Sequence, residues 1–355
     1  MTAQNNDVLF SELKGVNGDV GIITLNRPQV LNSLNHYMIT AMYAQLKIWA
    51  IAKNIKAVII QAAEGRAFCA GGDLRSTHER RHSGDETLVR FFYDEYQLNR
   101  FIFHFPKPYV ALLDGITMGG GVGISIHGSH RIATERLLFA MPETGIGFFP
   151  DVGGTYFLPR LPNKMGFYLG LTGARISSDD CIALGLTQQK VASESLPMLI
   201  QSIADASLGD DAKQTVSDVI SQFKQSVQSS ALMEKKNIVE KCFSAGSMEA
   251  IHDKLQESSE SLSKEALAQL SKKSPTSLKV TLLALMNGAK LDFDACMQQE
   301  FRLVSHFLQG HDFSEGIRAV IIDKDQQPKW KPALLADVTD TEVKQYFAPV
   351  KHELV

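Results

Sequence analysis

The sequence predicts an α/β protein whose second half is mainly helical. Short β-rich runs at residues 20–25, 57–61, 109–113 and 131–133 are separated by helical stretches or glycine turns, which is typical of strands that alternate with helices. From about Ser177 onward glycine becomes sparse, and Lys, Ser, Gln, Ala and Leu dominate in helical patterns. We therefore expect a mixed α/β core followed by a helical region.

A capped helix follows the first β-rich run. Asn35 can accept a hydrogen bond from the first turn of this helix, as N-cap residues do. The apolar positions recur at helical spacing, so one face should be buried. They are Met38, Met42, Leu46 and Trp49. In the second half, residues 262–268 and 278–286 have helical patterns, and the serine-rich residues 226–230 are predicted to form a loop.

Composition narrows the class of partner and the compartment. The formal net charge is -3 without a basic cluster, which disfavours nucleic acid as a partner. The uncharged stretch at residues 115–126 is too short to cross a bilayer, and the N-terminal residues have neither a signal core nor transit-peptide character. The cysteines, Cys69, Cys181, Cys242 and Cys296, are far apart, as expected of free thiols. We expect a cytoplasmic protein that binds a small molecule.

Two motifs that approach catalytic patterns are rejected. Residues 78–82 read HERRH and fit a zinc motif, but they include two arginines that would repel the metal and have no apolar face around them. Ser125 approaches the nucleophile elbow, but His127 stands where that turn needs a small residue, so Ser125 is expected inside a helix. Phosphate-loop and dinucleotide fingerprints do not occur. No metal is expected.

Two glycine-rich turns each follow a β-rich run. Residues 67–74 read AFCAGGDL, and residues 114–123 read DGITMGGGVG and lead into a helix-like stretch at 122–130. Glycine allows close approach to backbone N–H groups, and a helix N-terminus favours negative charge. One such turn is explained by tight packing, whereas two favour a shared oxyanion site, in which each donor contributes about 3–4 kcal/mol.

Two acids lie in apolar surroundings within residues 139–155, which read FAMPETGIGFFPDVGGT. Burial and a neighbouring carboxylate both raise the pKa of a carboxyl group, which suits Glu143 and Asp151 to nucleophile, base or proton-transfer work. No Lys or Arg within the segment compensates their charge. The alternative that Glu143 caps backbone amides of the loop, and Asp151 the turn at Gly153 and Gly154, stays open.

Glu95 falls inside the apolar stripe of a predicted helix. The stripe consists of Leu88, Phe91, Phe92, Leu98 and Ile102. A carboxylate at such a position needs a partner, because a buried charge is costly. That partner is either a basic side chain or the substrate.

The sequence resembles the crotonase (enoyl-CoA hydratase/isomerase) superfamily. The resemblance rests on ITLNRPQVLNSLN at residues 23–35 and on the two glycine-rich motifs in the same order. It implies a spiral of β-β-α units with the acyl-CoA-binding and catalytic core in residues 1–195 and a mainly helical region, 196–355, packing on that core. It also implies that the N–H groups of Gly72 and Gly120 hold the thioester oxygen.

Within that superfamily, hydratases carry a glutamate three residues after the second oxyanion donor, where this chain has Gly123. By contrast, MPETGIGFFPDVGGTYFLPRL at residues 141–161 and the stretch at 309–339 are similar to the 3-hydroxyisobutyryl-CoA hydrolases of valine degradation. This implies hydrolysis of the thioester by Glu143 and Asp151. Glu95, Gly120, Glu143 and Asp151 would contact the substrate, and CoA would enter only as part of that substrate, with no cofactor.

Two other functions stay open at this stage. One is an enoyl-CoA hydratase or isomerase that works with Glu143 alone, and the other is a non-catalytic acyl-CoA-binding protein. Trimers are common in the superfamily, so a homo-oligomer is compatible with the resemblance.

Overall fold

The computed structural model describes residues 6–75 and 87–355. Its contacts divide the chain into two compact units. Unit 1 comprises residues 1–72, 97–139 and 176–230, and unit 2 comprises residues 73–96, 140–175 and 231–355. These units interleave along the chain and are defined by compactness, so the catalytic-core boundary expected at residue 195 stays a prediction.

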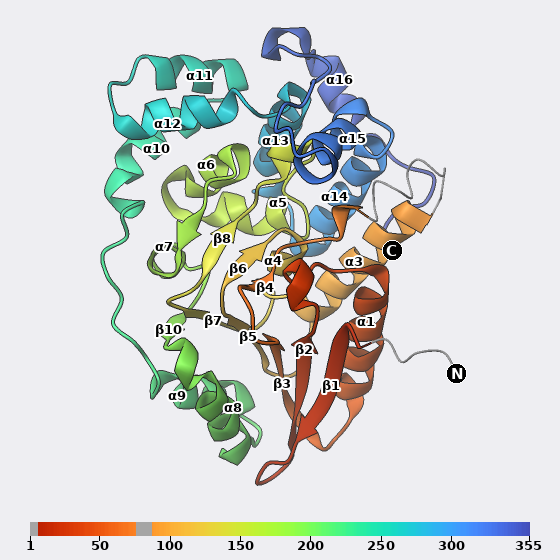
Figure 1. The fold of residues 1–355 in the computed structure, drawn as a ribbon, viewed down its shortest axis with the longest axis vertical. Coiled ribbons are helices and arrows are strands. Elements are labelled where there is room, and N and C mark those ends of the chain that lie inside the picture. Colours follow the sequence, from red (N-terminus) through yellow and green to blue (C-terminus); the bar gives the residue numbers. More distant parts are fainter. Residues whose placement is uncertain (1–5, 76–86) are drawn as a thin grey trace. The chain divides into compact units, whose positions relative to one another are not determined.

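Unit 1 contains a six-stranded sheet in the order β1-β2-β3-β5-β7-β10 (Figure 1). β1 is antiparallel to β2, and the other neighbours are parallel. The four β-rich runs predicted from the sequence lie within β2, β3, β5 and β7, so these predictions are confirmed. The strands are β1 (Val8–Leu13), β2 (Asp19–Leu25), β3 (Ile55–Ala62), β5 (Tyr109–Leu113), β7 (His130–Thr134) and β10 (Gln189–Val191).

A second sheet has four short strands, in the order β4-β6-β8-β9. From β3 to β8, successive strands alternate between the two sheets: β3 is followed by β4 and helix α3, and β5 is followed by β6 and helix α4. The repeat is therefore β-β-α, and the predicted fold class is confirmed. These elements are β4 (Ala67–Cys69), β6 (Ile116–Met118), β8 (Leu138–Ala140), β9 (Ile176–Ser177), α3 (Thr87–Phe103) and α4 (Gly120–Gly123).

Helix α1 (His36–Ile51) has the predicted cap and buried face. The Asn35 side chain accepts a hydrogen bond of 2.9 Å from the Met38 N–H. Met38, Met42, Leu46 and Trp49 are all buried. A Cβ on Gly21 of β2 would lie 2.8 Å from the Trp49 ring, so α1 packs on the face of the sheet to which Gly21 points.

The opposite face of the six-stranded sheet is covered by α8 (Leu196–Asp205) and α9 (Ala212–Ser221). Val20 and Ile22 flank Gly21 and therefore point to this side, because side chains alternate along a strand. They share an apolar cluster with Leu199 of α8 and Val216 of α9. Two helical layers thus bury the sheet and hold its strand ends in register.

Unit 2 is mainly helical. The segments predicted at residues 262–268 and 278–286 lie within α12 and α13, and residues 226–230 of unit 1 form a loop, as predicted. After β10 the described chain contains helices and loops only, which confirms the mainly helical second half. The helices of this unit beyond residue 140 include α5 (Gly154–Phe157), α6 (Met165–Thr172), α10 (Lys236–Phe243), α11 (Met248–Gln256), α12 (Ser261–Leu270), α13 (Pro275–Gly288), α14 (Phe293–Phe307), α15 (His311–Ile317) and α16 (Asp340–Gln345).

Candidate active site

The two glycine-rich turns of unit 1 lie side by side. β4 and β6, which lead into them, pair in parallel. Gly71 has φ +109°, and a Cβ placed on it would lie 3.6 Å from the Gly120 nitrogen and 3.3 Å from the Met118 oxygen. A side chain at this position would be both strained and crowded. The two turns are therefore close to each other, as a shared oxyanion site requires.

Gly72 and Gly120 occupy distinct positions at the turns. Gly72 forms an isolated parallel bridge with Leu34, and Gly120 is the first residue of α4. The first N–H groups of a helix have no partner within it, so the Gly120 N–H is available to an acceptor. That Gly72 and Gly120 hold one oxyanion stays a prediction.

The prediction of a helix over residues 122–130 is wrong, because the helix in the structure is shorter. α4 ends at Gly123, turns follow, and His130 already begins β7. Ser125 therefore lies just beyond the helix, buried, with its hydroxyl donating to the Gly121 carbonyl at 2.7 Å. Because α4 is one turn long, the N–H groups themselves matter more here than any helix dipole.

Substituting Gly121 with Ala is expected to destabilise unit 1, because the new Cβ would lie 2.3 Å from the Cys69 carbonyl oxygen. The atom that this Cβ meets belongs to the backbone and cannot rotate away, so the turns must separate. The free energy of unfolding should fall by about 1–3 kcal/mol, as in other overpacked sites. Chemical denaturation measures this change, with Gly209→Ala as a comparison in the same unit, since a Cβ there meets no atom within 4 Å. Equal stability of Gly121→Ala and wild type would contradict the close pairing.

The three carboxylates singled out in the sequence are all buried in unit 2. Glu143 begins a 3-10 helix (Glu143–Ile146) and is 5% exposed, Asp151 precedes α5 and is also 5% exposed, and Glu95 of α3 is 2% exposed. Among the described residues, Glu143 Oε2 and Glu95 Oε1 have no hydrogen-bond partner. Buried polar atoms are nearly always paired, so these two are candidates for contact with a ligand.

Burial raises the pKa of all three groups, and the Asp151 charge raises the pKa of the two glutamates further. Burial raises the pKa of Glu143 well above its ordinary value, and the nearby Asp151 charge raises it further. The same two causes act on the pKa of Glu95. Burial raises the pKa of Asp151 to about 7, although the hydrogen bond from Tyr96 acts in the opposite direction. The three carboxyls form one electrostatically coupled cluster, which is typical of acids that transfer protons.

The aromatic surroundings account for this burial. Phe148, between the two acids in the sequence, contacts the rings of Phe92, Phe149 and Phe313 with centroids 5.7, 4.7 and 4.7 Å apart. Aromatic rings exclude water and offer no strong acceptor or donor to a carboxylate. The apolar setting predicted for Glu143 and Asp151 is therefore confirmed.

The Asp151 side chain is held by Tyr96 of α3. The Tyr96 hydroxyl donates to Asp151 Oδ2 at 2.8 Å, and the Tyr96 side chain is fully buried. The turn at Gly153 and Gly154 does not use the Asp151 carboxylate, because the N–H groups of Gly153 and Thr155 donate to Glu300 instead. Asp151 Oδ1 is thus not committed to capping this turn.

Lys273 lies beside the Glu143 helical turn. It is half-buried in the loop between α12 and α13, and a Cβ on Gly145 would lie 3.0 Å from its Nζ. Its charge lowers the pKa of Glu143, and burial lowers the pKa of Lys273 itself to about 8. The expectation that no basic residue compensates these acids held only within the local segment, because Lys273 comes from the C-terminal region.

Substituting Lys273 with Met is expected to move the acid limb of the pH–rate profile of kcat/KM upward by about one pH unit. The lysine charge favours ionised Glu143, so removing it raises the pKa of Glu143 and the active form appears at higher pH. Activity below the limb falls about tenfold and recovers at higher pH. Lys272→Met, at the exposed neighbouring position, serves as the control. An unmoved limb in Lys273→Met would exclude this role.

A family model described as enoyl-CoA hydratase/isomerase matches residues 20–347. The chain belongs to this family. The resemblance stated from the glycine-rich motifs is thereby confirmed. Within the described residues of this family member, no group of three or more His, Cys, Asp and Glu side chains is arranged to hold a metal ion. The rejected zinc motif at residues 78–82 lies outside the described residues.

Curated relatives of this chain include proteins named 3-hydroxyisobutyryl-CoA hydrolase, mitochondrial. The rat protein named 3-hydroxyisobutyryl-CoA hydrolase, mitochondrial, is 46% identical over 93% of this chain and 86% of its own length. The human protein of the same name is 45% identical over the same shares. Identity of this level over nearly the whole chain places the helical C-terminal region within the similarity, as the stretch at residues 309–339 predicted.

Solved structures of family members share the fold but carry other names. A carnitinyl-CoA dehydratase from Mycobacterium thermoresistibile superimposes with TM-score 0.91 at 38% identity, covering 99% of each chain. An enoyl-CoA hydratase from Rhodobacter sphaeroides superimposes with TM-score 0.88 at 36% identity, covering 97% of this chain and 98% of its own. The crotonase fold is therefore certain, whereas the reaction needs a separate argument.

Sequence reasoning missed three residues of this site in the family member: Tyr96, Lys273 and Glu300. Glu300 could have been found from the sequence, because it interrupts the apolar face of α14. This face is formed by Phe293, Met297 and Val304. The same argument identified Glu95. Tyr96 and Lys273 had no such signal.

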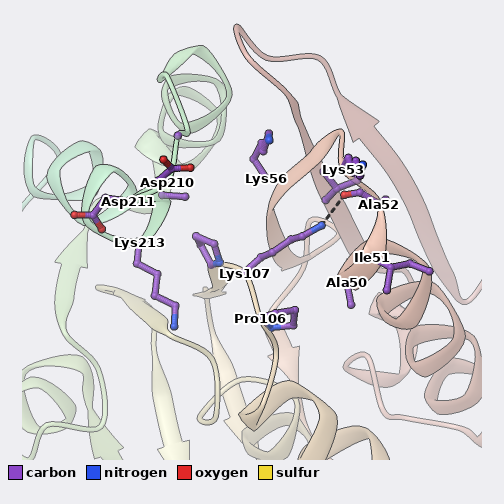
Figure 2. Close-up of a pocket in the computed structure, with 14 residues that line it drawn as sticks. Ala50, Ile51, Ala52, Lys53, Lys56, Pro106, Lys107, Asp210, Asp211 and Lys213 are labelled. Carbon is purple, nitrogen blue, oxygen red and sulfur yellow. Dashed lines mark hydrogen bonds between the residues drawn. The ribbon is translucent and has the colours of Figure 1, made fainter.

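A separate cleft of about 570 Å³ in unit 1 is not part of this site (Figure 2). It is lined by Lys53, Lys56, Lys107 and Lys213 together with Asp210 and neighbouring residues. The cleft adjoins the starts of β3 and β5, whereas the glycine-rich turns follow the ends of these strands. Ligands of parallel sheets bind at the carboxyl ends of the strands, which favours the glycine turns.

Proposed function

We propose that this chain hydrolyses the thioester of 3-hydroxyisobutyryl-CoA to 3-hydroxyisobutyrate and CoA. The curated relatives of that name support the substrate. The single observation that carries the reaction type is the pair of buried, coupled acids Glu143 and Asp151, with Glu143 Oε2 lacking a partner among the described residues. An unpaired carboxylate oxygen in an apolar site is suited to act on a carbonyl carbon.

In this proposal Glu143 acts on the thioester carbonyl carbon, either as the nucleophile or through a water whose proton it accepts. The carbonyl oxygen becomes an oxyanion, which the N–H groups of Gly72 and Gly120 stabilise. The carbon–sulfur bond then breaks and CoA leaves as thiolate, which needs little acid assistance because thiol pKa values are near 8.5. If Glu143 is the nucleophile, water hydrolyses the resulting anhydride. Either route consumes one water and requires no cofactor.

Asp151 and Glu95 take substrate roles in the proposal. Asp151, held by Tyr96, orients the 3-hydroxyl group or exchanges its proton. Glu95 contacts the substrate through Oε1, which is buried and without a partner in the described part of the chain. A basic partner for Glu95 is not found among the described residues, which favours the substrate contact over a salt bridge.

A second candidate function is hydration of a 2-enoyl-CoA, which the names of the two solved structures favour. Gly123 argues against it, because the resemblance places the first hydratase glutamate at this position, and glycine cannot transfer a proton. The proposal therefore retains hydrolysis as the reaction.

A free-thiol assay over a panel of acyl-CoA esters tests the proposal. We expect thiol release to be fastest with a branched 3-hydroxyacyl-CoA and slower with saturated or unsaturated chains of the same length. Tight CoA binding without thiol release from any ester would indicate a non-catalytic acyl-CoA-binding protein and would overturn the hydrolase.

The compartment and assembly are also part of the proposal. No helix in the described part of the chain combines the length and apolar character needed to cross a membrane. We propose the cytoplasm, since none of the four cysteines, which are all buried, forms a disulfide, although the curated relatives are named mitochondrial. Fractionation of cells tests the compartment, and light scattering tests whether the protein is a homo-oligomer. The acyl-CoA is the proposed partner, and neither nucleic acid nor a membrane is.

A further inference from the structure

The turn that follows Asp151 has an unusual backbone conformation. Val152 has φ +51° and Gly153 has φ +88°, so two successive residues are left-handed. A β-branched residue rarely adopts positive φ, and such strain persists only where surrounding contacts enforce it. Some group must therefore hold this turn in place.

Glu300 of α14 is that group. Its Oε2 accepts from the Gly153 N–H at 2.7 Å, and its Oε1 accepts from the Thr155 N–H at 2.9 Å and from the Thr155 hydroxyl at 2.7 Å. Left-handed turns direct successive N–H groups toward one point and so form an anion-binding concavity. The fully buried Glu300 carboxyl group fills this concavity and accepts all three hydrogen bonds.

α14 also contacts the residue that holds the Asp151 carboxylate. Phe301, next to Glu300, packs edge-to-face against the Tyr96 ring with centroids 6.4 Å apart. Tyr96 in turn donates to Asp151 Oδ2. Asp151 is thus constrained twice, at its carboxylate by Tyr96 and at the backbone that follows it by Glu300.

We propose that Glu300 is a positioning residue for Asp151, acting through the turn at residues 152–155. This inference rests on the proposed function, in which Asp151 orients the 3-hydroxyl of the substrate. Glu300 then determines how well the enzyme distinguishes 3-hydroxyacyl-CoA from the same ester without the hydroxyl. A small displacement of an orienting group is sufficient for a large loss of rate.

Glu300→Gln tests the proposal most strongly. Gln has the same shape, but its NH₂ group would face N–H donors and cannot accept from them. We expect thiol release from the 3-hydroxyacyl-CoA to fall about 10²-fold. Release from the ester without the hydroxyl should change less than about threefold, so the ratio of the two kcat/KM values falls. Arg302→Gln on the same helix removes a half-exposed ion pair with Glu353 and should leave this ratio unchanged.

If Glu300→Gln fails to fold, the comparison of Thr155→Val with Thr155→Ser tests the same proposal. Val removes one of the three donors to Glu300 with little change in shape, and Ser keeps that donor. The ratio should fall several-fold in Thr155→Val and stay near wild type in Thr155→Ser. If Thr155→Val folds but keeps the wild-type ratio, Glu300 has a structural role only.

Hydrogen exchange of the backbone separates this proposal from the proposed function. The N–H groups of Gly153 and Thr155 should exchange faster in Glu300→Gln and Thr155→Val than in wild type. If wild type releases no thiol from any ester, the proposed function fails while the exchange result still reports on the Glu300 contact. Faster exchange with an unchanged substrate ratio would overturn the positioning role. Unchanged exchange would overturn the contact itself.

Discussion

Substituting Glu143 with Gln is expected to lower kcat for thioester hydrolysis about 10³-fold, since a positioned acid or base contributes about 10²–10⁴-fold. The amide is neither a nucleophile toward the thioester nor a base, while its shape fits the same buried position. Stopped or continuous thiol-release assays at saturating acyl-CoA measure the loss. Glu265→Gln on α12 is the control, because that side chain is exposed.

The same substitution should increase stability at neutral and higher pH. The pKa of Glu143 is raised in the folded protein, so the folded state binds more protons than the unfolded one. The contribution of this group is complete below its ordinary pKa and is lost as the pH rises toward the raised value, at up to about 1.4 kcal/mol per pH unit. Gln has no such dependence, so the free energy of unfolding of Glu143→Gln should exceed that of wild type at pH 8. If Glu143→Gln is instead less stable than wild type, its loss of activity results from unfolding.

Substituting Asp151 with Asn is expected to lower kcat/KM for the 3-hydroxyacyl-CoA about 10²-fold. Asn can still accept from the Tyr96 hydroxyl, so the loss reports on charge and proton transfer rather than on this contact. A transition near pH 7 in the wild-type profile should disappear, because burial raises the pKa of Asp151 to about 7. The Glu143 limb should move to lower pH, since the Asp151 charge raises the pKa of Glu143.

Tyr96→Phe is the matched comparison for Asp151→Asn. It keeps the Asp151 carboxyl but removes the hydrogen bond that lowers its pKa. The transition near pH 7 should therefore persist and shift upward rather than disappear. A wild-type profile without any transition between pH 6 and 8, or the same profile in both variants, would contradict the assignment of Asp151.

Local patterns predicted the strands and the apolar setting of the two acids because their signals lie within short segments. The Asn35 cap and the buried face of α1 follow from residues within one helix. The apolar residues around Glu143 and Asp151 are evident in the sequence itself, without knowledge of the fold. The length of α4 could not be predicted, since glycines after Gly120 do not show where the turn stops.

The contacts between distant segments could not be predicted from local pattern. Lys273 reaches the Glu143 turn from a loop near α13, and nothing in its neighbours marks it. Valine prefers negative φ, so the local sequence predicts a negative φ at Val152. The φ of Val152 in the structure is positive. The Glu300 carboxyl group accepts from the N–H of the next residue, Gly153, and Glu300 belongs to a helix more than a hundred residues away.

We propose that this family member breaks a thioester rather than adding water to a double bond. The most direct test incubates the enzyme with a branched 3-hydroxyacyl-CoA and, separately, with the corresponding 2-enoyl-CoA, and identifies the products by mass spectrometry. We predict free 3-hydroxy acid and CoA from the first ester, and no hydrated thioester from the second. Accumulation of a 3-hydroxyacyl-CoA from the enoyl ester, with no release of CoA from either, would contradict the account.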